Sequence, residues 1–261
     1  MMNINEFIAQ VEAIAPLELQ EDWDNSGWQI KLTDGEISKV MVALEVNRQV
    51  VYDAVLNKVD LLVVHHPLIF GKIARVDNNS ITGNLIIELI KQGISVYATH
   101  TPFDRCEGGN NDYLGKVLGL ENIEPFMEND PAGYCRTGYL PGDGMRIADF
   151  IDAAAKALKM DRKFFNYSGS KEAVIKKIGW CTGAGAEFIK AAKAAGCDLY
   201  ITGDVKYHTA QEAKEIGLNV LDCGHFGTEH IFAENMIDKL DNLKEIDIIQ
   251  CDVNLNPFTI V

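Results

Sequence analysis

The sequence lacks the features that define several large classes of protein. No apolar stretch approaches the roughly 20 residues that a helix needs to cross a bilayer. Lys and Arg number 24 against 38 Asp and Glu, which gives a formal net charge of −14. An acidic surface without a basic cluster repels nucleic-acid phosphates and anionic membranes. We therefore expect no membrane partner, and nucleic acid is a poor candidate for one.

Paired cysteines and a targeting segment are also missing. The stretch MMNINEFIAQ at the start has no basic region followed by a continuous apolar run, so we expect no secretion signal. The cysteines form no CxxC pair, and we expect reduced thiols, several of them in the core. The six cysteines are Cys106, Cys135, Cys181, Cys197, Cys223 and Cys251. Together these observations predict a cytoplasmic location.

No phosphate-binding motif is complete. Gly183 and Gly185, in CTGAGAEF, fall at an expected turn from strand to helix, where backbone amides can hold a phosphate. There is no Walker lysine and no full GxGxxG, so this signal is weak. Trp23 and Trp28, in EDWDNSGWQ, are candidates to present aromatic faces to a base. We favour packing in the core as the explanation for both tryptophans.

What the chain does contain is an alternation of strands and helices. With 261 residues, 47% of them apolar, it can bury the cores of two ordinary domains. Hydrophobic periodicity predicts helices over residues 4–14, 48–58, 80–93, 146–159 and 207–217, and a long helix that starts near Thr228. Strands are expected over residues 39–46, 60–66, 94–100, 134–140, 163–168, 198–204, 217–225 and 245–254, and another is expected to begin at Lys177. Short, nearly all-apolar strands between helices predict an α/β protein with mostly parallel sheets and helices on both faces.

Two segments share the same spacing. A strand begins at Lys39 and the next opens at Asp60, and a strand begins at Lys177 and the next opens at Asp198. By subtraction, 60 − 39 and 198 − 177 both equal 21, so the two units align without a gap. We interpret this as an internal duplication of a βαβαβ unit, although any two βαβ units look broadly alike. The duplication predicts two similar α/β domains, residues 1–128 and 129–261, joined near the polar segment 128–133.

Five side chains stand at the expected carboxyl ends of strands, where ligands gather in open parallel sheets. They are His65, His66, Asp104, His225 and Glu229. Imidazole and carboxylate are common ligands of zinc, iron and manganese. Adjacent side chains on an extended chain point to opposite sides, so two neighbouring ions suit the adjacent histidines better than one. The pattern predicts two divalent metal ions in a crevice between the domains, with three ligands from the first and two from the second.

Structural readings of the same residues remain open at this point. A histidine at a strand end is often only hydrogen-bonded, and Asp104 can be a turn or helix-cap residue. His225 and Glu229, four apart, can form a solvated helix start. Glu45 and Asp204 end strands that face the same crevice. His208, Glu45 and His100 are candidates to move a proton or orient a ligand.

The motifs also resemble a known family. The segments DWDNSGWQI, LLVVHHPLIF, ATHTPFDRCEGGNNDYLGKVLGL, WCTGAGAEF, DLYITGDVKYHTA and DCGHFGTE are similar to those of the YbgI family, also called the Nif-three-like proteins. Bacterial members carry the label GTP cyclohydrolase 1 type 2 homologue. The resemblance implies two similar α/β domains, a ring-shaped homohexamer and a dinuclear site at the same five residues. The family commonly has Asp where this chain has Glu45, which puts a role for that position in doubt.

Two hypotheses of function follow. The first is a metal-dependent hydrolase that acts on a nucleotide, and the family label implies opening of the GTP ring with release of formate. His208 or Glu45 would then transfer protons. The second is a metal-binding or regulatory protein that interacts with partners without catalysis.

Overall fold

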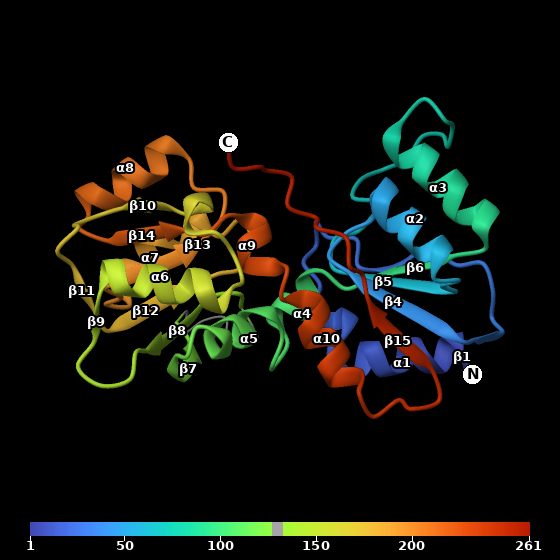
Figure 1. Cartoon of the computed structure of the whole chain (residues 1–261), viewed down its shortest axis with the longest axis horizontal. Helices are drawn as coiled ribbons and strands as arrows, with labels where there is room; N and C mark the ends of the chain where they lie inside the picture. The colour runs from blue at the N-terminus through green and yellow to red at the C-terminus, as the bar shows by residue number, and fades with distance from the viewer. Residues whose placement is uncertain (127–132) are drawn as a thin grey trace. The chain divides into compact units, whose positions relative to one another are not determined.

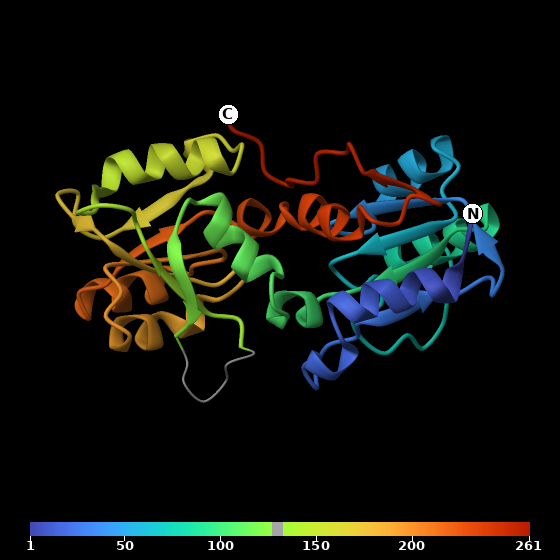
Figure 2. The same ribbon diagram turned by 90° about the horizontal axis from the view of Figure 1, so that it is seen from below.

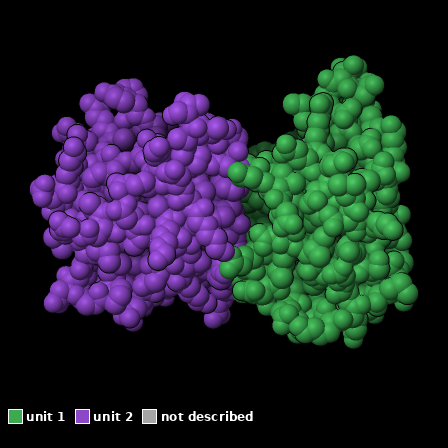
Figure 3. Space-filling view, viewed as in Figure 1, with its two compact units in different colours: residues 1–106, 232–255 green, residues 107–231, 256–261 purple. Residues whose placement is uncertain are grey.

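The computed structural model describes residues 1–126 and 133–261, which form a mixed α/β fold. Two compact units are present (Figure 1, Figure 3). Unit 1 comprises Met1–Cys106 and Phe232–Leu255, and unit 2 comprises Glu107–Ile231 and Asn256–Val261. The expected junction between residues 128 and 129 lies outside the described residues.

Unit 1 is built on a five-stranded sheet in the order β15-β4-β5-β6-β2. Its elements are β1 (Met2–Asn3), α1 (Ile4–Ile14), the 3₁₀ helix η1 (Leu17–Leu19), β2 (Gly27–Ile30), β3 (Glu36–Ile37), β4 (Lys39–Ala43), α2 (Arg48–Leu56), β5 (Leu61–Val64), α3 (Ile81–Gln92), β6 (Ser95–Ala98), α4 (Thr101–Arg105), α10 (Phe232–Leu240) and β15 (Asp247–Gln250). The pairs β15–β4, β4–β5 and β5–β6 are parallel, and β2 runs antiparallel to β6.

Helices cover both faces of this sheet. On one face, strand residues such as Met41, Leu62 and Val96 pack with the apolar sides of α2 and α3. α1 and α10 contact each other, and α10 contacts β4 and β15, on the opposite face (Figure 1). Because both faces are covered, the central strands are apolar at nearly every position, as the sequence pattern predicts.

Unit 2 is built on a six-stranded sheet in the order β10-β14-β13-β12-β8-β7. Its elements are α5 (Asn110–Val117), β7 (Glu121–Pro125), β8 (Arg136–Tyr139), β9 (Met145–Arg146), α6 (Ile147–Ala157), η2 (Arg162–Phe164), β10 (Asn166–Ser168), β11 (Val174–Ile175), β12 (Lys177–Trp180), η3 (Ala186–Phe188), α7 (Ile189–Ala194), β13 (Leu199–Thr202), α8 (Tyr207–Glu215), β14 (Asn219–Asp222) and α9 (His225–Glu229). Alternate residues of the central strands face opposite layers. Leu199 and Ile201 pack with α5 and α6, whereas Tyr200 and Val220 pack with α7 and α8 (Figure 2).

Two features of the chain differ from the sequence expectation. The sheet of unit 2 is more mixed than expected, because only β12–β13 and β13–β14 are parallel among its pairs in the described residues. The long helix expected from Thr228 is two helices, since α9 ends at Glu229 and α10 begins at Phe232.

No helix among residues 1–126 and 133–261 is long and apolar enough to cross a membrane. All six cysteines are buried, and each carries a thiol.

The two βαβ units that share a spacing also share a contact. In unit 1, Asp60 Oδ2 accepts hydrogen bonds from the amides of Ser38 and Lys39, at 2.7 and 3.0 Å. In unit 2, Asp198 Oδ2 accepts them from the amides of Lys176 and Lys177, both at 2.9 Å. In each unit one carboxylate therefore ties the start of the second strand to the start of the first. Equivalent contacts of this kind are what an internal duplication predicts.

We expect Asp60→Ala and Asp198→Ala each to lower the free energy of unfolding by about 1–2 kcal/mol, because two amides lose a charged acceptor. Urea unfolding followed by circular dichroism measures the change. Asp143→Ala is the matched control, since it removes the same charge from an exposed turn and should shift stability by less than about 0.5 kcal/mol. The contact has no structural weight if all three variants unfold alike.

Candidate metal centre

The adjacent histidines of unit 1 follow β5 at the point where the strand stops. Both amides donate to the carbonyl of Leu44, His65 at 3.1 Å and His66 at 2.9 Å, so the backbone is no longer extended. The two rings lie side by side, with centroids 5.1 Å apart. The expectation that they point to opposite sides was wrong here, because it assumed a strand that continues through both residues.

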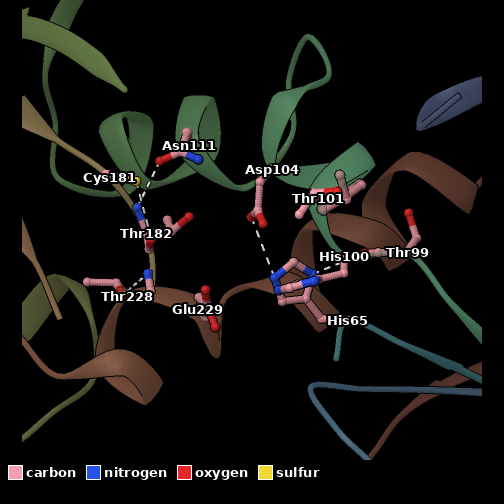
Figure 4. A network of polar contacts seen from close by, with 12 residues as sticks. His65, Thr99, His100, Thr101, Asp104, Asn111, Cys181, Thr182, Thr228 and Glu229 are labelled. Carbon is pink, nitrogen blue, oxygen red and sulfur yellow. Dashed lines mark hydrogen bonds and ion pairs between the residues drawn. The ribbon is translucent and has the colours of Figure 1, made fainter. Parts of the chain in front are cut away.

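His65 is fully buried and its ring orientation is fixed. Its Nδ1 lies 3.0 Å from the carbonyl oxygen of Thr99, which can only accept, so the proton of a neutral ring sits on Nδ1. The lone pair of Nε2 then faces Asp104, whose Oδ1 is 3.5 Å away (Figure 4). Asp104 is buried inside α4, so it is not a helix cap. The hydrogen bond from His65 Nδ1 to the Thr99 carbonyl is of the type that orients metal-binding histidines.

His100 completes a cluster of three imidazoles in unit 1. Its ring centroid lies 5.1 Å from that of His65 and 5.6 Å from that of His66. One nitrogen from each ring lies within 4.8 Å of the others, a spacing suited to a metal ion. His100 is the residue before the first turn of α4, and Asp104 lies within that short helix. His100 is therefore a further candidate ligand. From the sequence it was a candidate only to orient a ligand or to move a proton.

Asp24 holds His100 in place. Its Oδ1 lies 2.9 Å from His100 Nδ1, and its Oδ2 accepts the hydroxyls of Ser26 and Thr101 at 2.8 and 2.6 Å. Burial alone would raise the pKa of Asp24, but the hydrogen bonds from His100, Thr101 and Ser26 outweigh it and leave this pKa well below its usual range. The carboxylate stays ionised as a result. Sequence reasoning missed Asp24, which lies in the DWDNSG segment before β2.

His66 has a similar partner at longer range. Its Nδ1 lies 3.6 Å from Oε2 of Glu45, and its side chain is 23% exposed. This distance exceeds that of a hydrogen bond, so the pair is a looser charge contact. Glu45 thus faces the imidazole from the end of the neighbouring strand β4, as its position at a strand end predicts.

In unit 2, α9 carries His225 and Glu229 on one side. His225 Nδ1 lies 2.8 Å from Asp204 Oδ2, and Nε2 lies 2.9 Å from Glu229 Oε2. Glu229 is only 3% exposed, which argues against a solvated helix start. The imidazole is thus enclosed by two carboxylate oxygens.

The loop before η3 supports Glu229 and leaves little room for a phosphate. The amide of Gly183 donates to Thr228 Oγ1 and the amide of Gly185 donates to Thr202 Oγ1, both at 2.9 Å. These two amides are already used inside the protein, which disfavours the phosphate interpretation of the CTGAG segment. A Cβ atom at Gly183 would collide with the carboxylate of Glu229. The loop needs glycine there because it packs directly against a candidate ligand.

Asp222, at the end of β14, fixes the two loops that meet around His225. Its Oδ2 accepts from the amide of Val205 at 3.0 Å, and its Oδ1 accepts from the amide of Gly224 at 2.8 Å. Burial raises the pKa of Asp222 and these amide hydrogen bonds lower it in part. The carboxylate of Asp222 therefore fixes the backbone next to Asp204 and next to His225.

The remaining candidates lie elsewhere. His208 is exposed near the start of α8, with its ring against Tyr207. Trp28 packs edge-on against Tyr97, whereas Trp23 is 56% exposed. A cavity of about 470 Å³ in unit 2 is lined by Asp204 and by side chains that include Glu187, Lys190, Lys206 and Glu212. Its volume is in the range of small-molecule sites.

Comparison with known proteins identifies the family. The family model Duf34/NIF3 (NGG1p interacting factor 3) matches residues 2–257. The chain belongs to the Duf34/NIF3 family. The resemblance seen in the sequence motifs is thereby confirmed.

Relatives within the Duf34/NIF3 family cover nearly the whole chain. A protein of Clostridium perfringens named GTP cyclohydrolase 1 type 2 homolog is 35% identical over 251 residues, which are 95% of this chain and 94% of the relative. The structure of a Bacillus cereus protein related to NIF3 has a TM-score of 0.91 at 22% identity and covers 100% of this chain and 99% of its own. The structure of protein ybgI has a TM-score of 0.86 at 23% identity, with coverages of 98% and 100%. The two structures share the fold.

We expect Gly183→Ala to weaken metal binding by about 10- to 100-fold, because the added methyl group displaces the carboxylate of Glu229. Titration of the metal-free variant with zinc measures the affinity. Gly196→Ala is the matched control: Gly196 also has a positive φ, 75° against 63° for Gly183, but nothing lies within 4 Å of its added Cβ. Equal affinities in the two variants would show that backbone strain alone is at work.

Proposed function

We propose that this member of the Duf34/NIF3 family binds two divalent metal ions and uses them to hydrolyse a nucleotide. The proposed ligands are His65, His66, Asp104, His225 and Glu229. One observation carries the proposal. At His65, His100 and His225 an oxygen atom lies within hydrogen-bond distance of Nδ1, and at His65 and His225 a carboxylate oxygen also lies near Nε2.

The chemistry of the donor set fits a metal ion. A neutral imidazole with its proton on Nδ1 presents a lone pair at Nε2, and a carboxylate near that lone pair repels it unless a cation balances both. His65 faces Asp104 in this way in unit 1, and His225 faces Glu229 in unit 2. Imidazole and carboxylate together suit zinc, iron or manganese. Each unit by itself thus supplies a histidine–carboxylate pair suited to a cation.

That the two pairs act as one dinuclear site is part of the proposal. It is supported by the order of the motifs and by the connectivity of the chain. Asp104 stands two residues before Cys106, the last residue of the first segment of unit 1, and Glu229 stands two residues before Ile231, where the first segment of unit 2 ends. Asp104 and Glu229 therefore each stand shortly before a point at which the chain leaves its unit.

The protein side chains have defined tasks in this proposal. When bound, a pair of divalent ions supplies Lewis acidity that activates water and polarises the bond under attack. Thr99, Asp24 and Asp204 fix the rings of His65, His100 and His225, and so fix the direction of each Nε2 lone pair. Glu45, beside His66 Nδ1, is placed to hold a proton there. His208 lies exposed on α8, and no contact described for it supports the proton transfer expected from the sequence.

The substrate class rests on relatives. Curated relatives are named GTP cyclohydrolase 1 type 2 homolog, so GTP, with ring opening and release of formate, is the first substrate to test. The cavity beside Asp204 supports a small molecule as the ligand. Because the net charge is −14, bound cations are the natural counter-charge for a triphosphate.

A second function is favoured by the description of the family itself, which reads NGG1p interacting factor 3. In that case the metal ions would stabilise a binding protein or a regulator without turnover.

A ring-shaped homohexamer and a cytoplasmic location are also part of the proposal. The hexamer rests on the family resemblance, and the location is supported by the six cysteines, which are buried thiols.

Metal content and turnover test the proposed function together. We expect about two ions per chain by elemental analysis of protein purified without a tag or chelator. The Glu229→Gln variant should bind less metal and should no longer release formate from GTP, because an amide cannot replace the charge of a carboxylate ligand. Glu215→Gln, an exposed site with the same change of charge, should keep both.

Two other results would decide against the hydrolase. Full metal content with no turnover of GTP or simple phosphoesters favours the binding protein. A content below about half an ion per chain after incubation with zinc, iron or manganese means that the histidines are structural.

A further inference from the structure

Two large aromatic side chains of unit 1 stand exposed beside the histidine cluster. Trp23 and Phe70 are each 56% exposed, and their ring centroids lie 6.0 Å apart with the ring planes inclined at 48°. Trp23 does not pack in the core, in contrast to the expectation from sequence. Two adjoining apolar rings that face solvent are a feature of binding sites.

His100 connects the pair to the candidate metal centre. Its ring lies edge-on to both, with centroids 5.8 Å from Trp23 and 6.2 Å from Phe70. The same imidazole lies 5.1 Å from His65. A group that rests on the exposed rings is therefore within one side chain of the histidine cluster.

The two aromatic segments are fixed to each other before any ligand arrives. Asn25 Nδ2 donates to the carbonyl of Ile69 at 2.6 Å, and the amide of Ile69 donates to Gln29 Oε1 at 3.0 Å. Trp23 also adjoins Asp24, which is buried and holds His100. Both loops are thus tied by hydrogen bonds next to the exposed rings, so their position does not depend on packing of the rings in a core.

We propose that Trp23 and Phe70 form a stacking platform for a flat heteroaromatic ring of the substrate, such as a purine. This inference rests on the proposed function and names the residues that would hold the base of its substrate. Stacking on aromatic side chains recognises the face of a base, and it needs no positive charge on the protein. That property matters here because a net charge of −14 gives a polyanionic nucleotide no long-range attraction. We define Trp23 and Phe70 as the aromatic platform.

Tryptophan fluorescence reports on the aromatic platform directly. Trp180 is fully buried and Trp28 is packed on Tyr97, so an added ring that stacks at the surface acts on Trp23. The probes are guanosine, which has a base and no phosphate, and ribose 5-phosphate, which has a phosphate and no base. We expect saturable quenching by guanosine that changes little between low and high salt, and none by ribose 5-phosphate.

Variants then assign the binding. Phe70→Leu and Trp23→Leu should each weaken guanosine binding about tenfold. Binding to Trp23→Leu is measured by calorimetry, because this variant lacks the fluorescent reporter. Metal content should stay at the wild-type level in both, because neither residue is a ligand. Tyr52→Leu is the matched control, since Tyr52 is an exposed aromatic residue of α2 in the same unit, and it should bind guanosine as the wild type does.

Failure of this inference and failure of the proposed function give different results. Turnover of GTP with an unchanged KM in Phe70→Leu overturns the platform and leaves the hydrolase. Guanosine binding that depends on both rings, without turnover by the metal-loaded protein, supports the platform and overturns the hydrolase. A smaller assembly mass for the double variant Trp23→Leu/Phe70→Leu in sedimentation, with guanosine binding retained, shows that a second copy covers the rings and also overturns the platform.

Discussion

An oxygen atom facing Nδ1 of each imidazole is the contact on which the whole candidate centre depends. For His65 it is the carbonyl of Thr99, and for His100 and His225 it is a carboxylate of Asp24 or Asp204. A ring held in this way presents Nε2 in a fixed direction, which is a condition for a rigid metal site. These oxygens also set which ring nitrogen carries the proton.

The parallel sheets put those oxygens where they are needed. Val64 of β5 pairs with Ala98 of β6, so the next residues along each strand, His65 and Thr99, meet at the same edge. β2 runs antiparallel to β6, which brings the segment before it, with Asp24, to that edge as well. In unit 2, Thr202 pairs with Asp222, and the loops with Asp204 and His225 follow. Each unit therefore builds its part of the centre at the edge where its parallel strands end, and in unit 1 the segment before the antiparallel strand β2 joins it there.

Much of this fold and site can be predicted from sequence, and the rest cannot, for a physical reason. Apolar runs reveal the central strands, and a polar residue directly after such a run stands out. Asp24 could not be predicted because it lies in an irregular segment. That segment is positioned by β2, an antiparallel strand of only four residues. β15 was expected as a strand, but its parallel pairing with β4, Asp247 against Lys39, joins residues far apart in the chain. Local pattern predicts an element, whereas tertiary packing selects its partner.

The most direct test of the account is the protonation state of the ring nitrogens. Long-range proton–nitrogen correlation spectra of metal-free protein with ¹⁵N-labelled histidine distinguish a protonated Nδ1 from a protonated Nε2. We expect His65 to be protonated at Nδ1 and not at Nε2, and the Nε2 resonances of His65 and His225 to shift on addition of zinc. A His65 ring protonated at Nε2, with both resonances unmoved by zinc, would contradict the account.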